Sequence, residues 1–296
     1  MGVTLNTATG AIAGTLMLPS GNAPYRVVLI VAGSGPTDRN GNNPALPGEN
    51  DAYKLLAQAL SLEGIASVRY DKRGIAASAA AMPAGGESSL RFDDYIDDAA
   101  AWLNLLHADS RFSRTVVAGH SEGSLIGMIA AQRAPAFAYV SLEGAGRAAP
   151  VVLREQLKGK LPAALYAQAD AIVTSLQAGK SVAVDPDSPL VALFRQSVQP
   201  YLISWFKYDP TREIGKLHIP ATIVQGTADV QVTMEDARAL HEGDPSAKLV
   251  VVEGMNHVLK HAPDTSSQAA VLKGYGDSSL PVEPAVVQAV AASATA

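Results

Sequence analysis

Five residues near the middle of the chain combine a nucleophile with the backbone freedom that it needs. Gly119-His120-Ser121-Glu122-Gly123 is a G-x-S-x-G sequence that follows an apolar run and precedes a helical pattern. A serine lifted clear of a sheet edge occupies a tight, strained turn, and glycines on both sides relieve crowding with neighbouring backbone. Free N–H groups at the start of the next helix stabilise developing negative charge. We therefore predict that Ser121 is a catalytic nucleophile.

A serine hydroxyl needs a base within hydrogen-bond reach, and His257 is our choice among the six histidines. It follows an apolar strand pattern at residues 248–252, and loops after parallel strands emerge at the same sheet edge as the Ser121 turn. His261 is the second choice. The two histidines have the i, i+4 spacing of a metal pair, but the residues between them lack the glutamate of H-E-x-x-H. We predict no metal site.

The carboxylate that orients the base is predicted to be Asp229. It lies in a loop after the strand pattern at residues 221–225, and the chain order Ser121, Asp229, His257 is that of a Ser-Asp-His triad on a parallel sheet. Glu143 ends the strand that follows the nucleophile helix and is the weaker candidate for the triad acid.

Acyl transfer also requires two N–H donors for the tetrahedral oxyanion. The backbone amide of Glu122, directly after the nucleophile, is the first predicted donor. The Ser34 amide is the second, because Gly33 and Gly35 on either side allow the backbone to approach a substrate closely. These two glycines and His120 are predicted to contribute to the substrate pocket.

The remaining pattern alternates strands and helices, which is typical of a mostly parallel sheet covered by helices on both faces. A polar and apolar alternation over residues 3–17 predicts an edge hairpin, and residues 37–50 form a long polar loop. The other predicted strands are residues 25–31, 65–70, 116–118, 137–142, 221–225 and 248–252. The predicted helices are residues 53–62, 92–106, 122–133, 233–241 and 281–292.

This alternation breaks between residues 146 and 212, where the sequence is helical and irregular. We interpret this stretch as a helical cap inserted into one α/β core, whose parts are residues 1–145 and 213–296. The stretch is rich in aromatic residues, and we take Phe194, Tyr201 and Trp205 as candidates for a ligand pocket, although aromatic residues can also simply seat a cap on a core.

Composition excludes several classes of function. A formal net charge of -5 and the lack of any Lys/Arg run argue against nucleic-acid binding. With Cys 0 there is no thiol nucleophile, disulfide or cysteine-based metal site. No apolar stretch approaches the roughly 20 residues of a membrane span, and no signal segment is recognisable. Cytoplasmic and exported locations stay open, as does the oligomeric state.

With these residues placed, the chain resembles the α/β-hydrolase superfamily, above all bacterial serine esterases and serine-aminopeptidase-like hydrolases with a helical cap. The likeness rests on residues 32–41, on Tyr70-Asp71-Lys72-Arg73-Gly74, on the Ser121 turn, and on the loops of Asp229 and His257. It implies an α/β-hydrolase fold, a Ser-Asp-His triad, and no cofactor. One departure is that the oxyanion loop reads Ala-Gly-Ser-Gly, where many relatives have His-Gly.

Two charged stretches of this resemblance have a structural interpretation. Asp38 and Arg39 are more readily explained by an ion pair that fixes their loop than by substrate contact. Residues 71–74 are expected to hold the loop beneath the site.

The sequence thus predicts a serine hydrolase that cleaves small carboxylic esters of short to medium acyl chain through an acyl-enzyme. One alternative is an aminopeptidase-like hydrolase of short peptides, which needs carboxylates to bind the substrate's amine; Glu122, Glu143 and Asp38 are the candidates. The other alternative is a non-catalytic ligand-binding protein of the same fold.

Overall fold

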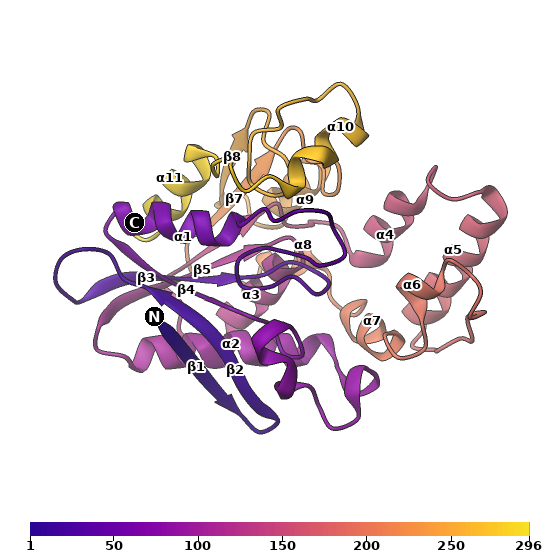
Figure 1. The fold of residues 1–296 in the computed structure, drawn as a ribbon, viewed down its shortest axis with the longest axis horizontal. Helices are drawn as coiled ribbons and strands as arrows, with labels where there is room; N and C mark the ends of the chain where they lie inside the picture. The colour runs from indigo at the N-terminus through magenta and orange to yellow at the C-terminus, as the bar shows by residue number, and fades with distance from the viewer. Residues whose placement is uncertain (296) are drawn as a thin grey trace.

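The computed structural model describes residues 1–295 and is built on one 8-stranded sheet with the order β1-β2-β4-β3-β5-β6-β7-β8 (Figure 1). The strands are β1 (Gly2–Thr7), β2 (Gly10–Met17), β3 (Tyr25–Val31), β4 (Ile65–Tyr70), β5 (Phe112–His120), β6 (Ala138–Leu142), β7 (Ala221–Gly226) and β8 (Lys248–Val252). β1 and β2 form an antiparallel hairpin, and β2 pairs antiparallel with β4. From β4 to β8 every pair of neighbours is parallel. This is the mostly parallel sheet that the sequence predicts.

The sheet places β5 at its centre because that strand has neighbours on both sides. β3 pairs with one edge of β5 and β6 with the other. Central parallel strands are covered on both faces, which explains the continuous apolar sequences of β3 and β5. The carboxyl ends of β5, β7 and β8 therefore open at one edge of the sheet, the edge where α/β folds bind ligands.

Helices connect these strands and cover both sides of the sheet. The α-helices are α1 (Ala52–Leu62), α2 (Phe92–Ala108), α3 (Glu122–Arg133), α4 (Ala149–Leu157), α5 (Ala163–Gln177), α6 (Val191–Phe194), α7 (Gln199–Trp205), α8 (Pro210–Ile214), α9 (Met234–Gly243), α10 (Gln268–Lys273) and α11 (Pro284–Ser293). Short 3-10 helices are η1 (Ala76–Ala81), η2 (Gly86–Ser89) and η3 (Gly274–Gly276). Within residues 1–295, none of the helices combines the length and the hydropathy that crossing a bilayer would require.

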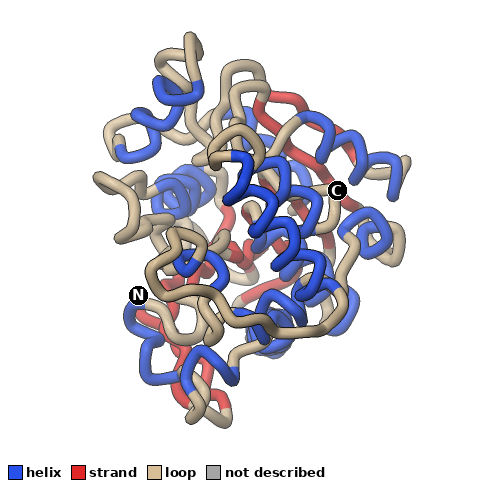
Figure 2. Tube along the Cα trace, turned by 90° about the vertical axis from the view of Figure 1, so that its right-hand side faces the viewer, coloured by secondary structure: helices blue, strands red, loops and turns tan. Residues whose placement is uncertain are grey.

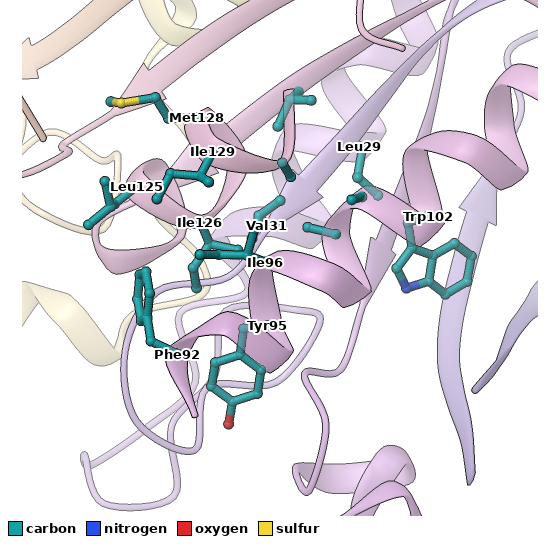
Figure 3. Packing of buried hydrophobic residues seen from close by; sticks show 14 of the residues in the cluster. Leu29, Val31, Phe92, Tyr95, Ile96, Trp102, Leu125, Ile126, Met128 and Ile129 are labelled. Atoms are coloured by element: carbon teal, nitrogen blue, oxygen red, sulfur yellow. The ribbon is translucent and has the colours of Figure 1, made fainter. Parts of the chain in front are cut away.

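Two apolar layers form because alternate residues of each strand point to opposite faces. Val28 and Ile30 pack with apolar residues of α1 and α11, whereas Leu29 and Val31 pack with those of α2, α3 and α9. Figure 3 shows side chains of α2 and α3 gathered around Leu29 and Val31 in the second layer. The two layers fix the strand ends relative to the helices that follow them.

The chain between β6 and β7 is helical throughout its regular structure, from α4 to α8. In Figure 1 the helices α4 to α7 stand together to one side of the sheet, and Figure 2, viewed from that side, has helices in front of the strands. The last of these helices ends at Ile214, two residues beyond the predicted stretch. Division of the chain into a core and a cap stays a prediction.

Aromatic rings join this helical segment to the core. Phe92, the first residue of α2, stacks on Trp205 of α7 at a centroid distance of 5.6 Å, and Tyr95 meets Tyr201 edge to face at 5.7 Å. The backbone N–H of Phe92 also donates to Ser204 Oγ at 2.8 Å. The ring contacts and this hydrogen bond are largely buried, and together they hold α7 against the start of α2.

Most predicted strands and helices agree with the structure to within two or three residues. The largest differences are at β5, which begins at Phe112, four residues before the predicted strand, and after His257, where α10 and η3 were not expected. Both α10 and η3 are short and have no regular apolar spacing, so their sequence carries no periodic signal.

Trp102 of α2 provides a test of the second apolar layer. Its side chain is fully buried and lies 5.6 Å from the ring of Tyr70. We expect Trp102→Ala to lower the free energy of unfolding by about 3–5 kcal/mol, because the indole leaves a cavity that the sheet cannot refill. Leu105→Ala is the control, since Leu105 lies on the same helix but is 43% exposed. Chemical denaturation measures both, and equal effects would contradict the assignment of Trp102 to the core.

Candidate active site

The turn at Ser121 joins the end of β5 to the start of α3. Ser121 has φ 54° and ψ −123°, a left-handed conformation that costs free energy in any residue with a side chain. A Cβ at Gly119 would collide with the backbone of Gly123, and a Cβ at Gly123 would collide with that of Val31. The two glycines are therefore required by close packing of backbone, as the sequence predicts.

Ser121, His257 and Asp229 lie in one hydrogen-bonded line. His257 Nε2 is 3.0 Å from Ser121 Oγ, and His257 Nδ1 is 2.6 Å from Asp229 Oδ2. A carboxylate only accepts, so Nδ1–H donates to Asp229 and leaves Nε2 to accept from the serine hydroxyl. The three residues come from the ends of β5, β7 and β8, three strands of the same sheet edge.

Asp229 is buried but well supplied with donors. Its side chain is 0% exposed, and its second oxygen accepts from the backbone N–H groups of Gln231 at 2.7 Å and Val232 at 3.1 Å. Burial alone would raise the pKa of Asp229, but the hydrogen bonds and the imidazole of His257 outweigh burial and lower that pKa below its usual value. Asp229 is therefore held as a carboxylate against His257.

Glu143 lies behind Asp229 rather than against the histidine. It is fully buried at the end of β6, and its Oε1 accepts the N–H of Gly226 at 2.9 Å. Within residues 1–295 its Oε2 has no donor, and the neighbouring side chain is the carboxylate of Asp229. Burial first, and then the charge of Asp229, raise the pKa of Glu143 well above its usual value. The protonated form of Glu143 is therefore favoured, and in that form its carboxyl can donate to Asp229.

His120 lies beneath the turn, where it links several loops. Its Nε2 is 2.6 Å from the backbone oxygen of His257, and its Nδ1 is 2.7 Å from Tyr53 Oη. A carbonyl oxygen only accepts, so Nε2 carries the proton and Nδ1 accepts from Tyr53. Tyr53 Oη in turn accepts the N–H of Gly33 at 3.0 Å. Burial lowers the pKa of His120 to about 3, which keeps the ring neutral in this chain of hydrogen bonds.

An apolar cavity of about 420 Å³ opens at Ser121. Its walls include Ser34, Gly35 and Glu122 on the side of the sheet. The helical segment contributes Val152, Leu153, Phe194, Val198, Tyr201, Leu202 and Trp205. The three predicted aromatic residues are thus among the lining residues.

Gly33 and His120 are corrections to the predicted pocket, since neither is among the residues that line the cavity. His120 is turned under the nucleophile by its bonds to Tyr53 and His257. Gly33 packs against the turn, where a Cβ would lie 3.2 Å from Ser121 Cβ. Both residues support the site from below.

The other charged residues named from the sequence fix loops. Arg39 pairs with Asp71 at 2.7 Å rather than with its neighbour Asp38, whose carboxylate accepts the backbone N–H groups of residues 40 and 42. His261 is 68% exposed at its side chain and bonds to Glu283 at 3.1 Å, away from His257. In the described part of the chain, no cluster of three or more acidic or histidine side chains is arranged to hold a metal ion.

The sequence did not predict that two residues, Tyr53 and Lys72, contribute hydrogen bonds to the site. Tyr53 falls in a predicted helix, and a tyrosine on the buried face of a helix carries no signal that its hydroxyl is used. Lys72 was interpreted only as part of a supporting loop, yet its ammonium contacts Gly33 and Glu122. Lys72 stands between Asp71 and Arg73, so the sequence carries no signal that distinguishes it from its charged neighbours.

Glu143 generates a prediction on stability against pH. A group whose pKa is raised by folding contributes stability below its unfolded pKa and loses it as the pH rises toward the folded pKa. Glu143→Gln keeps a donor for Asp229 and an acceptor for Gly226 but removes this titration. We expect the variant to become more stable relative to wild type as the pH rises from 5 to 8, by up to about 1.4 kcal/mol per pH unit.

Denaturant unfolding at several pH values measures this difference, with Glu253→Gln at an exposed position as the control. His120 titrates in both proteins, so its contribution cancels in the comparison. A difference between Glu143→Gln and wild type that stays constant from pH 5 to 8 would contradict the raised pKa of Glu143.

Known proteins share this sequence pattern and this fold. A family model described as serine aminopeptidase S33 matches residues 48–188, a range that contains Ser121 but ends before Asp229. Esterase EstD of Thermotoga maritima is 27% identical over 263 residues, which cover 88% of this chain. The chain spans 61% of the length of that relative.

Solved structures with this fold include enzymes described as esterases and serine hydrolases. Est1E from Butyrivibrio proteoclasticus, in a structure with bound ferulic acid, has a TM-score of 0.61 and 17% identity over 93% of this chain and 96% of its own. XC6422 from Xanthomonas campestris, described as an α/β serine hydrolase without a lid, has a TM-score of 0.52 and 17% identity over 96% of each chain. The chain has the α/β-hydrolase fold, and over residues 48–188 its sequence is similar to that of serine hydrolases.

Proposed function

We propose that the protein is a carboxylesterase that hydrolyses small esters through an acyl-enzyme on Ser121. The observation that carries this proposal is the line from Ser121 Oγ through His257 to Asp229 at the mouth of an apolar cavity. The name of the relative EstD, an esterase, supports the same reaction.

In the first half of the reaction, His257 Nε2 takes the Ser121 proton while Oγ attacks the ester carbonyl carbon. Asp229 stabilises the imidazolium that forms, because its carboxylate accepts from Nδ1 at 2.6 Å. The N–H groups of Ser34 and Glu122 hold the oxyanion of the tetrahedral intermediate. When the intermediate collapses, the C–O bond to the alcohol breaks and His257 returns the proton to the leaving oxygen.

In the second half, water takes the place of the alcohol. His257 removes a proton from the water as it attacks the acyl carbon, and the same two N–H groups hold the second oxyanion. Collapse releases the carboxylic acid and returns the proton to Ser121 Oγ. Each step uses only side chains and backbone groups of this chain, so the proposed reaction has no cofactor.

The cavity supports an uncharged acyl group of short to medium length, because the two arginines on its wall, Arg147 and Arg195, are paired with acidic side chains. Its volume of about 420 Å³ falls within the range of about 300–1,000 Å³ that small-molecule sites occupy. Phe194, Tyr201 and Trp205 give its walls a largely apolar character. We propose that residues 146–212 act as a cap, and that the cap determines which acyl groups fit.

The peptidase alternative deserves a test because the matching family model is named for a serine aminopeptidase. Such an enzyme needs a free carboxylate to bind the substrate's ammonium group. Among residues 1–295, Glu122 is the one acidic residue on the cavity wall, and its two oxygens are engaged by Lys72 at 3.1 Å and Tyr201 at 2.6 Å. Glu143 is buried beneath Asp229. This engagement of the carboxylates favours esters over peptides.

The first test compares p-nitrophenyl acetate, butyrate, octanoate and palmitate as substrates. We expect turnover to be highest on acetate or butyrate and to fall on the long chains, because the cavity limits acyl length. Ser121→Ala should lose about 10⁴-fold or more in kcat, since the nucleophile is removed while the fold remains. The rate of wild type should fall at acidic pH, because a protonated His257 cannot accept the serine proton.

Full activity of a folded Ser121→Ala protein would contradict the assignment of the nucleophile. Covalent labelling of wild type, but not of this variant, by a fluorophosphonate probe gives the same answer without a substrate. A protein that neither labels nor turns over any ester is a ligand-binding member of the superfamily.

The second test sets p-nitrophenyl butyrate beside alanine p-nitroanilide under the same conditions. We expect kcat/KM for the ester to exceed that for the anilide by at least about 10³-fold, because no free carboxylate on the cavity wall pairs with the ammonium. Comparable values for the two substrates would favour the peptidase.

A further inference from the structure

Lys72 is a charged residue enclosed at the base of the site. It is the second residue after β4, and its side chain is 2% exposed. The ammonium donates to the backbone oxygen of Gly33 at 2.5 Å and to Glu122 Oε2 at 3.1 Å, and it lies 4.9 Å from the centre of the Tyr95 ring. Burying an ammonium is costly unless its hydrogen bonds are satisfied, so these partners define its position.

The bond to Gly33 acts on the peptide unit that contains the Ser34 N–H. A trans peptide is planar, and its C=O and N–H point in opposite directions. A donor fixed on the Gly33 oxygen therefore fixes the direction of the Ser34 N–H, on the side away from Lys72. A positive donor on the oxygen also polarises the amide and makes its N–H a stronger donor.

The neighbouring peptide is fixed as well. The N–H of Gly33 donates to Tyr53 Oη at 3.0 Å, so the peptide units on both sides of Gly33 are held by side chains. The loop after β3 is thus prevented from rotating next to Ser34, which lines the cavity. Glycine at this position needs such support, because it has no side chain to restrict its own backbone.

Lys72 also contacts the residue that supplies the other proposed donor. Glu122 is the first residue of α3, where backbone N–H groups have no partner within the helix. Its carboxylate bridges Lys72 and the hydroxyl of Tyr201, which donates to Oε1 at 2.6 Å. One ammonium therefore contacts the Gly33–Ser34 peptide through its oxygen and Glu122 through its side chain, and these two segments supply the proposed oxyanion donors.

We propose that Lys72 is a positioning residue of the oxyanion hole: it orients and polarises the Gly33–Ser34 peptide and anchors Glu122 at the start of α3. This inference rests on the proposed function. The ammonium touches no substrate and exchanges no proton. Its effect is to hold two N–H groups in the geometry that the tetrahedral intermediate requires, so it stabilises the transition state more than the bound ester.

The test removes the charge together with its counter-ion. Lys72→Met alone would leave Glu122 buried without a partner, so the variant of choice is the double substitution K72M/E122Q, which has no buried charge. The measurements are kcat and KM for p-nitrophenyl butyrate and the inhibition constant of a trifluoromethyl ketone, which forms a tetrahedral adduct with an oxyanion. Lys216→Met is the matched control, because Lys216 forms an ion pair with Glu213 outside the site.

We expect K72M/E122Q to lose about 10- to 100-fold in kcat, with KM within about threefold of wild type, and to bind the ketone more weakly by a similar factor. The control should match wild type in all three. A loss in thermal stability with kcat and ketone binding unchanged would assign Lys72 a structural role only, and would overturn the inference.

Two further outcomes are separable. If K72M/E122Q does not fold, K72Q/E122Q keeps an uncharged donor in the same place, and a loss in kcat of less than threefold in whichever variant folds overturns the inference. Wild type that neither turns over an ester nor binds the ketone overturns the proposed function, and the role of Lys72 with it. If wild type turns over the ester and binds the ketone, and the variant is equally active, the role of Lys72 is overturned but the proposed function is not.

Discussion

The left-handed backbone at Ser121 is the constraint on which the rest of the structure depends. A non-glycine residue with φ 54° is strained by about 1–3 kcal/mol, and it persists only where its surroundings leave no alternative. β5 lies between β3 and β6, so the strand before the turn cannot shift. The close contacts of Gly119 and Gly123 allow the helix to begin within one residue of the strand end. Packing of the central sheet thus provides the rigidity that the nucleophile needs.

A second constraint comes from several ionisable groups that are buried close together. Each of them must either be neutral or have hydrogen-bond partners for its charge. The pKa of Asp229, which is surrounded by donors, is lowered, whereas the pKa of Glu143 behind it is raised, because two buried carboxylates side by side disfavour a second charge. His120 is neutral and links Tyr53 to the loop of His257. Each group has the protonation state that its neighbours can satisfy. In the line of three residues, Ser121 Oγ–H therefore donates to His257 Nε2, and His257 Nδ1–H donates to Asp229.

The fold and the residues that meet at Ser121 could both be predicted from the sequence, but for different reasons. Strand and helix positions follow from apolar periodicity, and the end of a parallel strand restricts where Asp229 and His257 can lie. Apolar periodicity does not predict the direction in which a side chain in a turn or loop points. His120 is adjacent to the nucleophile in sequence but lies beneath it, because a turn with positive φ sends neighbouring side chains to different sides. The partners of Lys72 are distant in sequence, so its role is visible only in the folded chain.

The sheet edge and the helical segment between β6 and β7 contribute different parts of the site. The groups proposed for the chemistry lie at strand ends and are held by the sheet, whereas the walls of the cavity come largely from the segment between β6 and β7. Tyr201 joins the two parts, since its hydroxyl binds Glu122 while its ring meets Tyr95. By engaging Glu122, it turns the one acidic side chain of the cavity away from a ligand. The same contact that anchors α7 therefore leaves the cavity suited to a neutral acyl group, and changes in the helical segment can alter the choice of substrate without moving Ser121.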